Sequence, residues 1–264
     1  MVAYIFTRVF VELFRFVPFF AVYIISDIIQ FILFNVFGYR KKVIFKNLHI
    51  VFPEKTEDEI QKIAKGFYQN FTDLLLETIK GFSISEKEIL RRYKVLNAQV
   101  LDKYYNQGKS VISLAGHYAN WEWGIILGKV LKHETKVIYK PLSNNKINTY
   151  MKLNRERFGI NMIPMKETNS AFVETNKPFT VFLVADQSPS SYGKAIWIDF
   201  LGQETACIHG PEAYSRKMGS PVVFYKIKRV KRGFYTLEII ELTNKPNKLK
   251  NGELTKLYMN LLEN

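Results

Sequence analysis

The stretch SVISLAGHYANWEWGIILG, Ser110 to Gly128, passes from one kind of secondary structure to another within nineteen residues. Its first part, residues 111–114, is apolar and rich in β-branched side chains, which is typical of a buried strand. Gly116 then offers a turn, and His117 and Glu122 follow before a helical pattern resumes. The segment therefore predicts a strand, a tight turn that carries polar residues, and a helix.

The rest of the chain after residue 95 repeats this alternation of strands and helices. Strands are expected at 110–115, 136–140, 160–164, 179–185, 195–200, 221–228 and 234–241. Helices are expected at 98–107, 120–131, 145–158, 168–175, 211–218 and 253–263. Such alternation predicts an α/β fold with a mostly parallel central sheet flanked by helices. We assign it to a domain over residues 43–264.

A long amphipathic helix is expected before this alternation begins. Thr56 has Glu59 three residues further on, which is the spacing of a capping box. Apolar residues then recur at steps of three and four, which predicts one buried helical face. Gly81 is the expected end of this helix.

The N-terminal residues 1–42 are expected to contact a membrane. Residues 13–37 are very apolar, but Arg15, Pro18 and Asp27 interrupt them, whereas a spanning helix needs about 20 uninterrupted apolar residues. No small-residue cleavage site follows, so a signal peptide is a poor match.

A helical hairpin or bent helix lying in one leaflet fits this segment. The basic residues Arg40, Lys41, Lys42 and Lys46 would then lie at the level of the lipid headgroups. A buried core helix and a single-pass anchor remain the alternatives.

The composition narrows the class of partner without choosing one. The 264 residues are 47% hydrophobic, and 38 Lys and Arg against 24 Asp and Glu give a net charge of +14. Nucleic acid, anionic lipid and an acidic carrier protein all suit that sign. The basic residues are scattered and no base-reading motif is present, which argues against nucleic acid. The single Cys207 excludes an internal disulfide framework.

The positions of His117 and Glu122 suggest acid–base chemistry. On one continuous helix the two side chains would point in different directions, so they meet only if the chain turns between them. In open α/β sheets, ligands bind outside the carboxyl ends of the strands, which is where His117 falls. A histidine held by a carboxylate is a general base with a fixed tautomer.

The sequence offers neither a protein nucleophile nor a metal site beside this pair. Ser113 lies inside the strand and Cys207 has no obvious partner. The spacing differs from that of H-E-x-x-H, and the other histidines lie in unrelated contexts, so no metal is expected. A base without a protein nucleophile suggests direct transfer to a substrate hydroxyl. A structural histidine is the alternative, and the Trp121 side chain is expected to pack or to wall an acyl slot.

Several segments together resemble the lipid A late acyltransferases (lauroyl and myristoyl transferases), a branch of the lysophospholipid acyltransferase superfamily that carries H-x4-D/E. The segments are GHYANWEWG (116–124), KNLHIVFPEKTEDEI (46–60), IYKPLSN (138–144), NRERFGI (154–160) and the stretch from Asp186-Gln187 to Pro221-Val222-Val223. Two features depart from the family. Position 140 is Lys where Arg is common, and the chain ends before the usual aromatic, basic C-terminal segment, so it is expected to be incomplete there.

The resemblance implies a glycerolipid acyltransferase-like fold and a catalytic pair. His117 would take the proton from an acceptor hydroxyl as that oxygen attacks a thioester. Glu122 would orient the imidazole and stabilise its cation.

The resemblance also implies a set of binding residues. Lys140, Arg155 and Arg157 would supply charge for an anionic headgroup or for the phosphopantetheine of a carrier, unless the two arginines are solvated residues of a helix face. Asn120 is expected to bind substrate or to cap the following helix. Asp186 and Gln187 follow an apolar strand and would bind substrate hydroxyls, or serve only the structure of their loop.

The function expected from these residues is that of a membrane-associated O-acyltransferase. It would move a fatty acyl chain from acyl carrier protein, or from acyl-CoA, to a hydroxyl of a lipid A precursor or related glycolipid, with the thioester as co-substrate and no cofactor. Its expected place is the bacterial inner membrane, with the catalytic domain on the cytoplasmic side and an anionic membrane surface as partner.

Three other functions remain open. The first is transfer to a lysophospholipid or an amino-acid lipid. The second is a non-enzymatic role on a membrane surface. The third is a hydrolase that uses the same pair to activate water.

Overall fold

The computed structural model describes residues 2–173 and 175–263, and the chain forms two compact units, Val2–Ile84 and residues 85–263. The division into units falls after Ile84, further along the chain than residue 42. The assignment of membrane contact to residues 1–42 and of catalysis to residues 43–264 stays a prediction.

The N-terminal unit is helical. It comprises α1 (Val2–Arg15), α2 (Phe19–Phe31), the π-helical turn η1 (Ile32–Val36), α3 (Lys41–Val51) and α4 (Glu57–Gly81). The predicted capping box of α4 is confirmed: the Thr56 hydroxyl accepts a hydrogen bond from the Glu59 amide at 3.4 Å, and the Glu59 carboxylate accepts one from the Thr56 amide at 2.9 Å.

Pro18 separates the apolar N-terminal segment into two helices. It precedes α2 with an extended backbone and cannot continue α1, because its ring removes a donor and clashes with the preceding turn. The following segment Phe19–Val36 has a mean hydropathy of 2.0 and is long enough, by length and composition, to cross a membrane. The apolar N-terminal helix is thus present.

The second unit alternates strands and helices. Its strands are β1 (Tyr93–Val95), β2 (Val111–Ala115), β3 (Glu134–Tyr139), β4 (Asn161–Pro164), β5 (Phe179–Val184), β6 (Ile196–Phe200), β7 (Gln203–Cys207), β8 (Val222–Lys231) and β9 (Phe234–Thr243). Its α-helices are α5 (Glu86–Arg92), α6 (Gln99–Tyr105), α7 (Leu127–Val130), α8 (Asn145–Glu156), α9 (Thr168–Ala171), α10 (Gly210–Met218) and α11 (Glu253–Glu263). Short 3₁₀ turns are η2 (Trp121–Ile126), η3 (Met165–Glu167), η4 (Tyr192–Lys194) and η5 (Pro246–Lys248).

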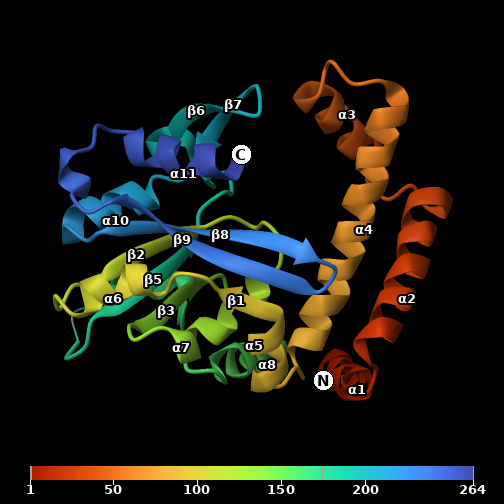
Figure 1. The fold of residues 1–264 in the computed structure, drawn as a ribbon, viewed down its shortest axis with the longest axis horizontal. Helices are drawn as coiled ribbons and strands as arrows, with labels where there is room; N and C mark the ends of the chain where they lie inside the picture. The colour runs from red at the N-terminus through yellow and green to blue at the C-terminus, as the bar shows by residue number, and fades with distance from the viewer. Residues whose placement is uncertain (1, 174, 264) are drawn as a thin grey trace. The chain divides into compact units, whose positions relative to one another are not determined.

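Within the described residues, seven of these strands form one sheet in the order β1-β9-β8-β2-β5-β3-β4 (Figure 1). The neighbours β8–β2, β2–β5, β5–β3 and β3–β4 are parallel, whereas β9 is antiparallel to β8. The predicted α/β fold with a mostly parallel sheet is therefore confirmed.

Helices cover both faces of this sheet (Figure 1). Ile112, Leu114 and Val181 point to one face and form a core with Leu254 and Tyr258 of α11. The alternate residues of the same strands point to the other face, because successive side chains of a strand lie on opposite sides. That other face holds the candidate site.

Three local predictions were wrong or incomplete. The helix expected over 120–131 is the 3₁₀ turn η2 followed by the short α7, in a run that contains two glycines, which have low helix propensity. The expected strand at 195–200 is present as β6, but it pairs only with β7 in a separate antiparallel hairpin. The helix expected over 168–175 ends at Ala171, and residue 174 lies outside the described residues.

The β6–β7 hairpin was missed because of its turn. Leu201 and Gly202 both have positive φ, 51° and 73°, as a tight turn between twisted strands requires. Glycine adopts this conformation readily but leucine does not, so the sequence carries only half of the usual turn signal.

Candidate active site

The candidate site lies where the neighbouring parallel strands β2 and β5 end. Ala115 is in register with Val184, and the Ala185 amide donates a hydrogen bond to the Ala115 carbonyl at 2.9 Å. The two chains therefore leave the sheet side by side, and this brings His117 next to Asp186.

Asp186 holds His117 through two hydrogen bonds. Nδ1 of the imidazole lies 2.7 Å from Oδ1 of Asp186, and the His117 amide donates to Oδ2 at 2.7 Å. Burial by itself would raise the pKa of Asp186. The side-chain and backbone hydrogen bonds from His117 outweigh burial, so the pKa of this carboxyl lies below its ordinary value. Asp186 is thus a carboxylate that fixes both the ring and the backbone of His117.

This contact corrects the expected partner of the histidine. We expected Glu122 to orient the imidazole, but within the described residues Asp186 is its carboxylate partner. The Nδ1–H of His117 donates to Asp186. On the opposite side of the ring, Nε2 has no hydrogen-bond partner among the described residues. The proton acceptor of a neutral imidazole in this arrangement is Nε2.

The loop between β2 and η2 is built for this close approach. A Cβ atom at Gly116 would lie 3.1 Å from Oδ2 of Asp186 and 2.5 Å from a Leu262 methyl group. Ala119 has a φ of 50°, which is unfavourable for a residue with a Cβ atom and persists only where the surroundings impose it. Trp121 meets the His117 ring edge to face, with centroids 5.1 Å apart.

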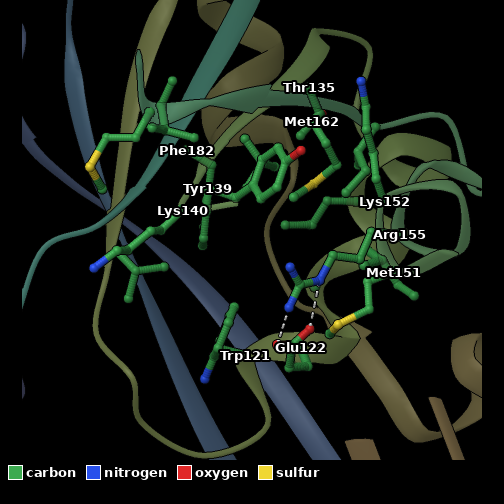
Figure 2. Close-up of a pocket in the computed structure, with 18 of the residues that line it drawn as sticks. Trp121, Glu122, Thr135, Tyr139, Lys140, Met151, Lys152, Arg155, Met162 and Phe182 are labelled. Carbon is green, nitrogen blue, oxygen red and sulfur yellow. Dashed lines mark hydrogen bonds and ion pairs between the residues drawn. The ribbon is translucent and has the colours of Figure 1, made fainter. Parts of the chain in front are cut away.

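Glu122 binds Arg155 of α8 instead of the histidine. The two groups form a bidentate pair, with Nη2 at 2.5 Å from Oε1 and Nε at 3.1 Å from Oε2 (Figure 2). Each side chain is 19% exposed. The ion pair therefore joins η2 to α8 across the cavity described next.

An apolar cavity of about 360 Å³ opens beside His117. It lies between the sheet, η2, α7 and α8, and Figure 2 shows labelled side chains of the sheet, η2 and α8 around it. Its apolar lining includes Trp121, Val137, Phe182, Met151, Met162 and Ile160. A long apolar group is the ligand that such a cavity suits.

The lining residues form layers along the strands. Tyr139, Val137 and Thr135 succeed one another on one face of β3, from its carboxyl end inward. Val137 is in register with Phe182 and with Met162. Layers two residues apart are separated by about 6.6 Å, so the cavity runs inward from His117 along the strand direction.

The cavity brings together most of the predicted site residues. His117, Trp121, Glu122, Lys140, Arg155 and Gln187 all line it. Asp186 contacts His117 without lining the cavity, whereas Asn120 and Arg157 are elsewhere. The Asn120 side chain caps η2 by accepting from the Trp123 amide at 3.1 Å, and Arg157 lies over the Phe158 ring.

Burial lowers the pKa of Arg157, as desolvation of a cation does. Asp186 was expected to bind substrate, and its role as the direct partner of His117 was missed. The only signal for it in the sequence is its position at the end of a strand. Of the apolar lining, only Trp121 was expected.

Among the described residues, no group of three or more His, Cys, Asp and Glu side chains could hold a metal ion. The ionisable side chains that line the cavity include the imidazole of His117, the carboxylate of Glu122 and the basic groups of Lys140, Lys152 and Arg155.

The fold and the cavity together define an α/β protein with a candidate active site at the carboxyl ends of parallel strands, beside an apolar pocket. Over residues 2–263 the chain matches the model of the family described as bacterial lipid A biosynthesis acyltransferase, and it belongs to that family. The predicted family is thereby confirmed, and with it an acyltransferase activity. Comparison with curated proteins gives no match.

Proposed function

We propose that this protein transfers a fatty acyl chain from a carrier-bound thioester to a hydroxyl of a lipid A precursor or related glycolipid. The observation that carries the proposal is the His117–Asp186 pair at the mouth of an apolar cavity. Acyl carrier protein is the proposed donor, with acyl-CoA as the other thioester of the same chemistry. No cofactor takes part in the proposed reaction.

In the proposed mechanism His117 is the general base and Asp186 is its positioning residue. Asp186 accepts the Nδ1–H, so Nε2 takes the proton of the acceptor hydroxyl while that oxygen attacks the thioester carbonyl carbon. The carbon–sulfur bond of the tetrahedral intermediate then breaks. The proton on Nε2 passes to the leaving sulfur, which restores the neutral imidazole and leaves an ester and a thiol.

The apolar cavity suits the acyl chain of the donor. Its walls are formed largely by aromatic, branched and methionine side chains, and His117 is among its lining residues. Lys140 is exposed at this mouth and is the proposed contact for an anionic group of the donor. Glu122 and Arg155 neutralise each other, so their proposed role is to hold η2 and α8 around the acyl chain.

A second cavity, of about 330 Å³, is the proposed place of the acceptor. Gly116 and Tyr118, which flank His117 in the chain, line it together with Lys226 and Lys228 of β8 and with Glu263. The two lysines suit an anionic headgroup. The acceptor hydroxyl would then reach His117 from one side and the thioester from the other.

The place proposed for the reaction is the cytoplasmic face of the bacterial inner membrane. The net charge of +14 suits an anionic membrane surface, and the apolar N-terminal helices suit lipid contact.

Replacement of His117 tests the proposal. His117→Ala should lower kcat by about 10²–10⁴-fold, because the general base is lost. The matched control is His49→Ala, which removes an exposed histidine of the N-terminal unit that binds Glu57. Mass spectrometry of the lipid product and of free fatty acid gives the readout, and circular dichroism checks folding.

Each other outcome identifies a different function. Normal turnover by a folded His117→Ala protein would rule out the mechanism. Release of free fatty acid without acylated lipid would indicate a hydrolase. Acylation of a lysophospholipid alone would change the acceptor. If the wild-type protein turned over no thioester, a non-enzymatic function would be indicated.

A further inference from the structure

Helix α2 carries a polar stripe through an otherwise apolar segment. Tyr23, Ser26, Asp27 and Gln30 succeed one another at steps of three, one and three residues. Residues so spaced lie on one face of a helix. The stripe lies within the 18 residues of Phe19–Val36, whose mean hydropathy is 2.0.

The polar stripe is bound to α4. The Ser26 hydroxyl lies 2.6 Å from Oδ1 of Asp73 and 2.9 Å from the Thr72 hydroxyl, and both Ser26 and Asp73 are 0% exposed. The Tyr23 hydroxyl donates to Glu77 at 3.0 Å, and the Gln69 amide donates to Asp27 at 2.8 Å. Three of the four polar side chains of the stripe, those of Tyr23, Ser26 and Asp27, are thus bound by side chains of α4, and Gln30 is buried.

The pairing extends beyond both ends of α2. At one end Lys80 of α4 donates to the carbonyl oxygens of Phe14, Arg15 and Val17 at 3.2, 2.6 and 2.7 Å, and so binds the chain between α1 and α2. At the other end the Tyr68 hydroxyl of α4 donates at 2.5 Å to the carbonyl of Tyr39, which follows η1 in the chain. Helix α4 therefore accompanies the whole apolar segment.

Helix α4 is too polar to enter hydrocarbon. Besides Asp73, Glu77 and Lys80 it carries Glu57, Asp58, Glu59, Lys62 and Lys65. Charged side chains at the depth of the bilayer centre are costly and are rare there. A crossing by α2 would take α4 with it, because the two helices are joined along their length, so the same hydrogen bonds that satisfy α2 oppose a crossing.

The opposite face of α2 is apolar and exposed. Phe20, Ile24, Ile28 and Phe31 recur at steps of three and four residues and are all exposed. Helix α1 adds Phe6, Phe10 and Leu13, and Phe16, directly after α1, is 82% exposed. Arg40, Lys41 and Lys42 lie where α3 begins, after the apolar segment. An apolar helical surface beside basic residues suits one leaflet of an anionic bilayer.

We propose that the N-terminal unit is monotopic: α1 and α2 lie in one leaflet with their exposed apolar faces in lipid, while α4 lies on the aqueous side of α2. The chain at the start of α1 and the chain after α4 are then on the same side of the membrane. This inference rests on the proposed function in that the acceptor is a membrane lipid.

Chemical labelling of the full chain in sealed vesicles of anionic phospholipid tests this topology. Single cysteines are placed in a Cys207→Ala background, by Tyr4→Cys in α1 and by Lys87→Cys in α5, which is exposed. A membrane-impermeant maleimide added outside should label both positions to extents within about twofold of each other. A crossing helix would give a different result: the cysteine at position 87 would be labelled at least tenfold more than the one at position 4, and only detergent would make the two equal. That result would overturn the proposal.

A second measurement identifies what covers the apolar face. A fluorophore at Ile28→Cys should be quenched at least twofold by nitroxide-bearing lipids, whereas one at Lys65→Cys, on the exposed surface of α4, should not. Equal quenching at both positions would overturn the orientation. If the cysteine of Ile28→Cys is protected from the maleimide but its fluorophore is not quenched by the lipids, a second copy of the chain covers this face. That result would also overturn the proposed orientation.

These measurements do not depend on catalysis. Repeating them in the His117→Ala protein separates the two proposals, since loss of transfer with unchanged labelling leaves the topology standing. Normal transfer with the labelling pattern of a crossing helix rejects the topology alone.

Discussion

At the scale of residues, two carboxylates near His117 have different partners. Asp186 binds the imidazole, and Glu122 binds Arg155. The two carboxylates therefore affect the reaction in different ways, and substitutions distinguish them.

Asp186→Asn should lower kcat by about 10²–10⁴-fold, because a neutral amide no longer stabilises the imidazolium that forms as Nε2 takes the proton. The KM values should change little, since Asp186 does not line the apolar cavity. Steady-state kinetics with both substrates measure this. Equal turnover by wild type and variant would exclude Asp186 as the positioning residue.

The pH dependence of stability provides a second test of the same residue. The folded-state pKa of Asp186 is lowered, so its ionised form stabilises the fold at all pH values above the unfolded value of about 3.9. That contribution is lost as the pH falls through the lower folded-state pKa. The difference in the free energy of unfolding between wild type and Asp186→Asn should thus shrink as the pH falls below about 3.9.

Glu122 should be coupled energetically to Arg155 and not to His117. In a double-mutant cycle, Glu122→Gln and Arg155→Met should show a coupling of about 0.5–3 kcal/mol in the free energy of unfolding, because either change alone leaves an unpaired, mostly buried group. The control cycle pairs Glu122→Gln with His117→Ala and should be additive within about 0.5 kcal/mol. The reverse result would restore Glu122 as the partner of the histidine.

At the scale of elements, the layers along β3 and β5 predict control over the length of the acyl chain. Val137→Phe fills the layer nearer His117 and should favour shorter donors, by about tenfold or more in the ratio of kcat/KM for short and long chains. Thr135→Leu fills the layer further in and should exclude only longer chains, because the cavity remains open up to that depth.

The control for this series is Val181→Ile, on the opposite face of β5. It adds a methylene to the core without reaching the cavity, so the preference for chain length should not change. A uniform loss for all donors in Val137→Phe, with the same preference as wild type, would contradict this use of the cavity.

At the scale of the whole molecule, the net charge of +14 predicts a reaction whose substrate affinity depends on salt. The Debye length falls from about 10 Å at 0.1 M to about 3 Å at 1 M. Salt should therefore raise the KM for the carrier-bound donor more than it lowers kcat, since the bound chemistry takes place in a partly enclosed cavity.

Lys140→Ala should imitate high salt at one contact, because Lys140 is exposed at the cavity mouth. Arg155 is unsuitable for this test, since Glu122 neutralises it. A salt titration of both kinetic constants in wild type and Lys140→Ala measures the effect. A KM that is independent of salt in both proteins would assign the charge to solubility or topology instead.

Much of the local structure was predictable, because the interactions that form it lie within a few residues. The capping box of α4 needs only Thr56 and Glu59, and the apolar run of β2 is typical of a buried strand wherever it occurs. The position of His117 at the end of β2 follows from the same short pattern. The resemblance of the motifs to one family was likewise visible in the sequence, and the family match confirms it.

The partners of the polar groups were decided by tertiary structure. Asp186 is 69 residues from His117 in the chain and meets it only because β5 lies beside β2 in the sheet. The order of strands depends on how their apolar faces are buried together, and no local pattern encodes it. Glu122, the carboxylate nearer to His117 in sequence, is carried by η2 toward α8 and Arg155. The polar stripe of α2 can be read from the sequence, but only the packing of α4 against it shows that Tyr23, Ser26 and Asp27 have partners inside the protein. Such partners matter because burial of an unpaired polar group is costly.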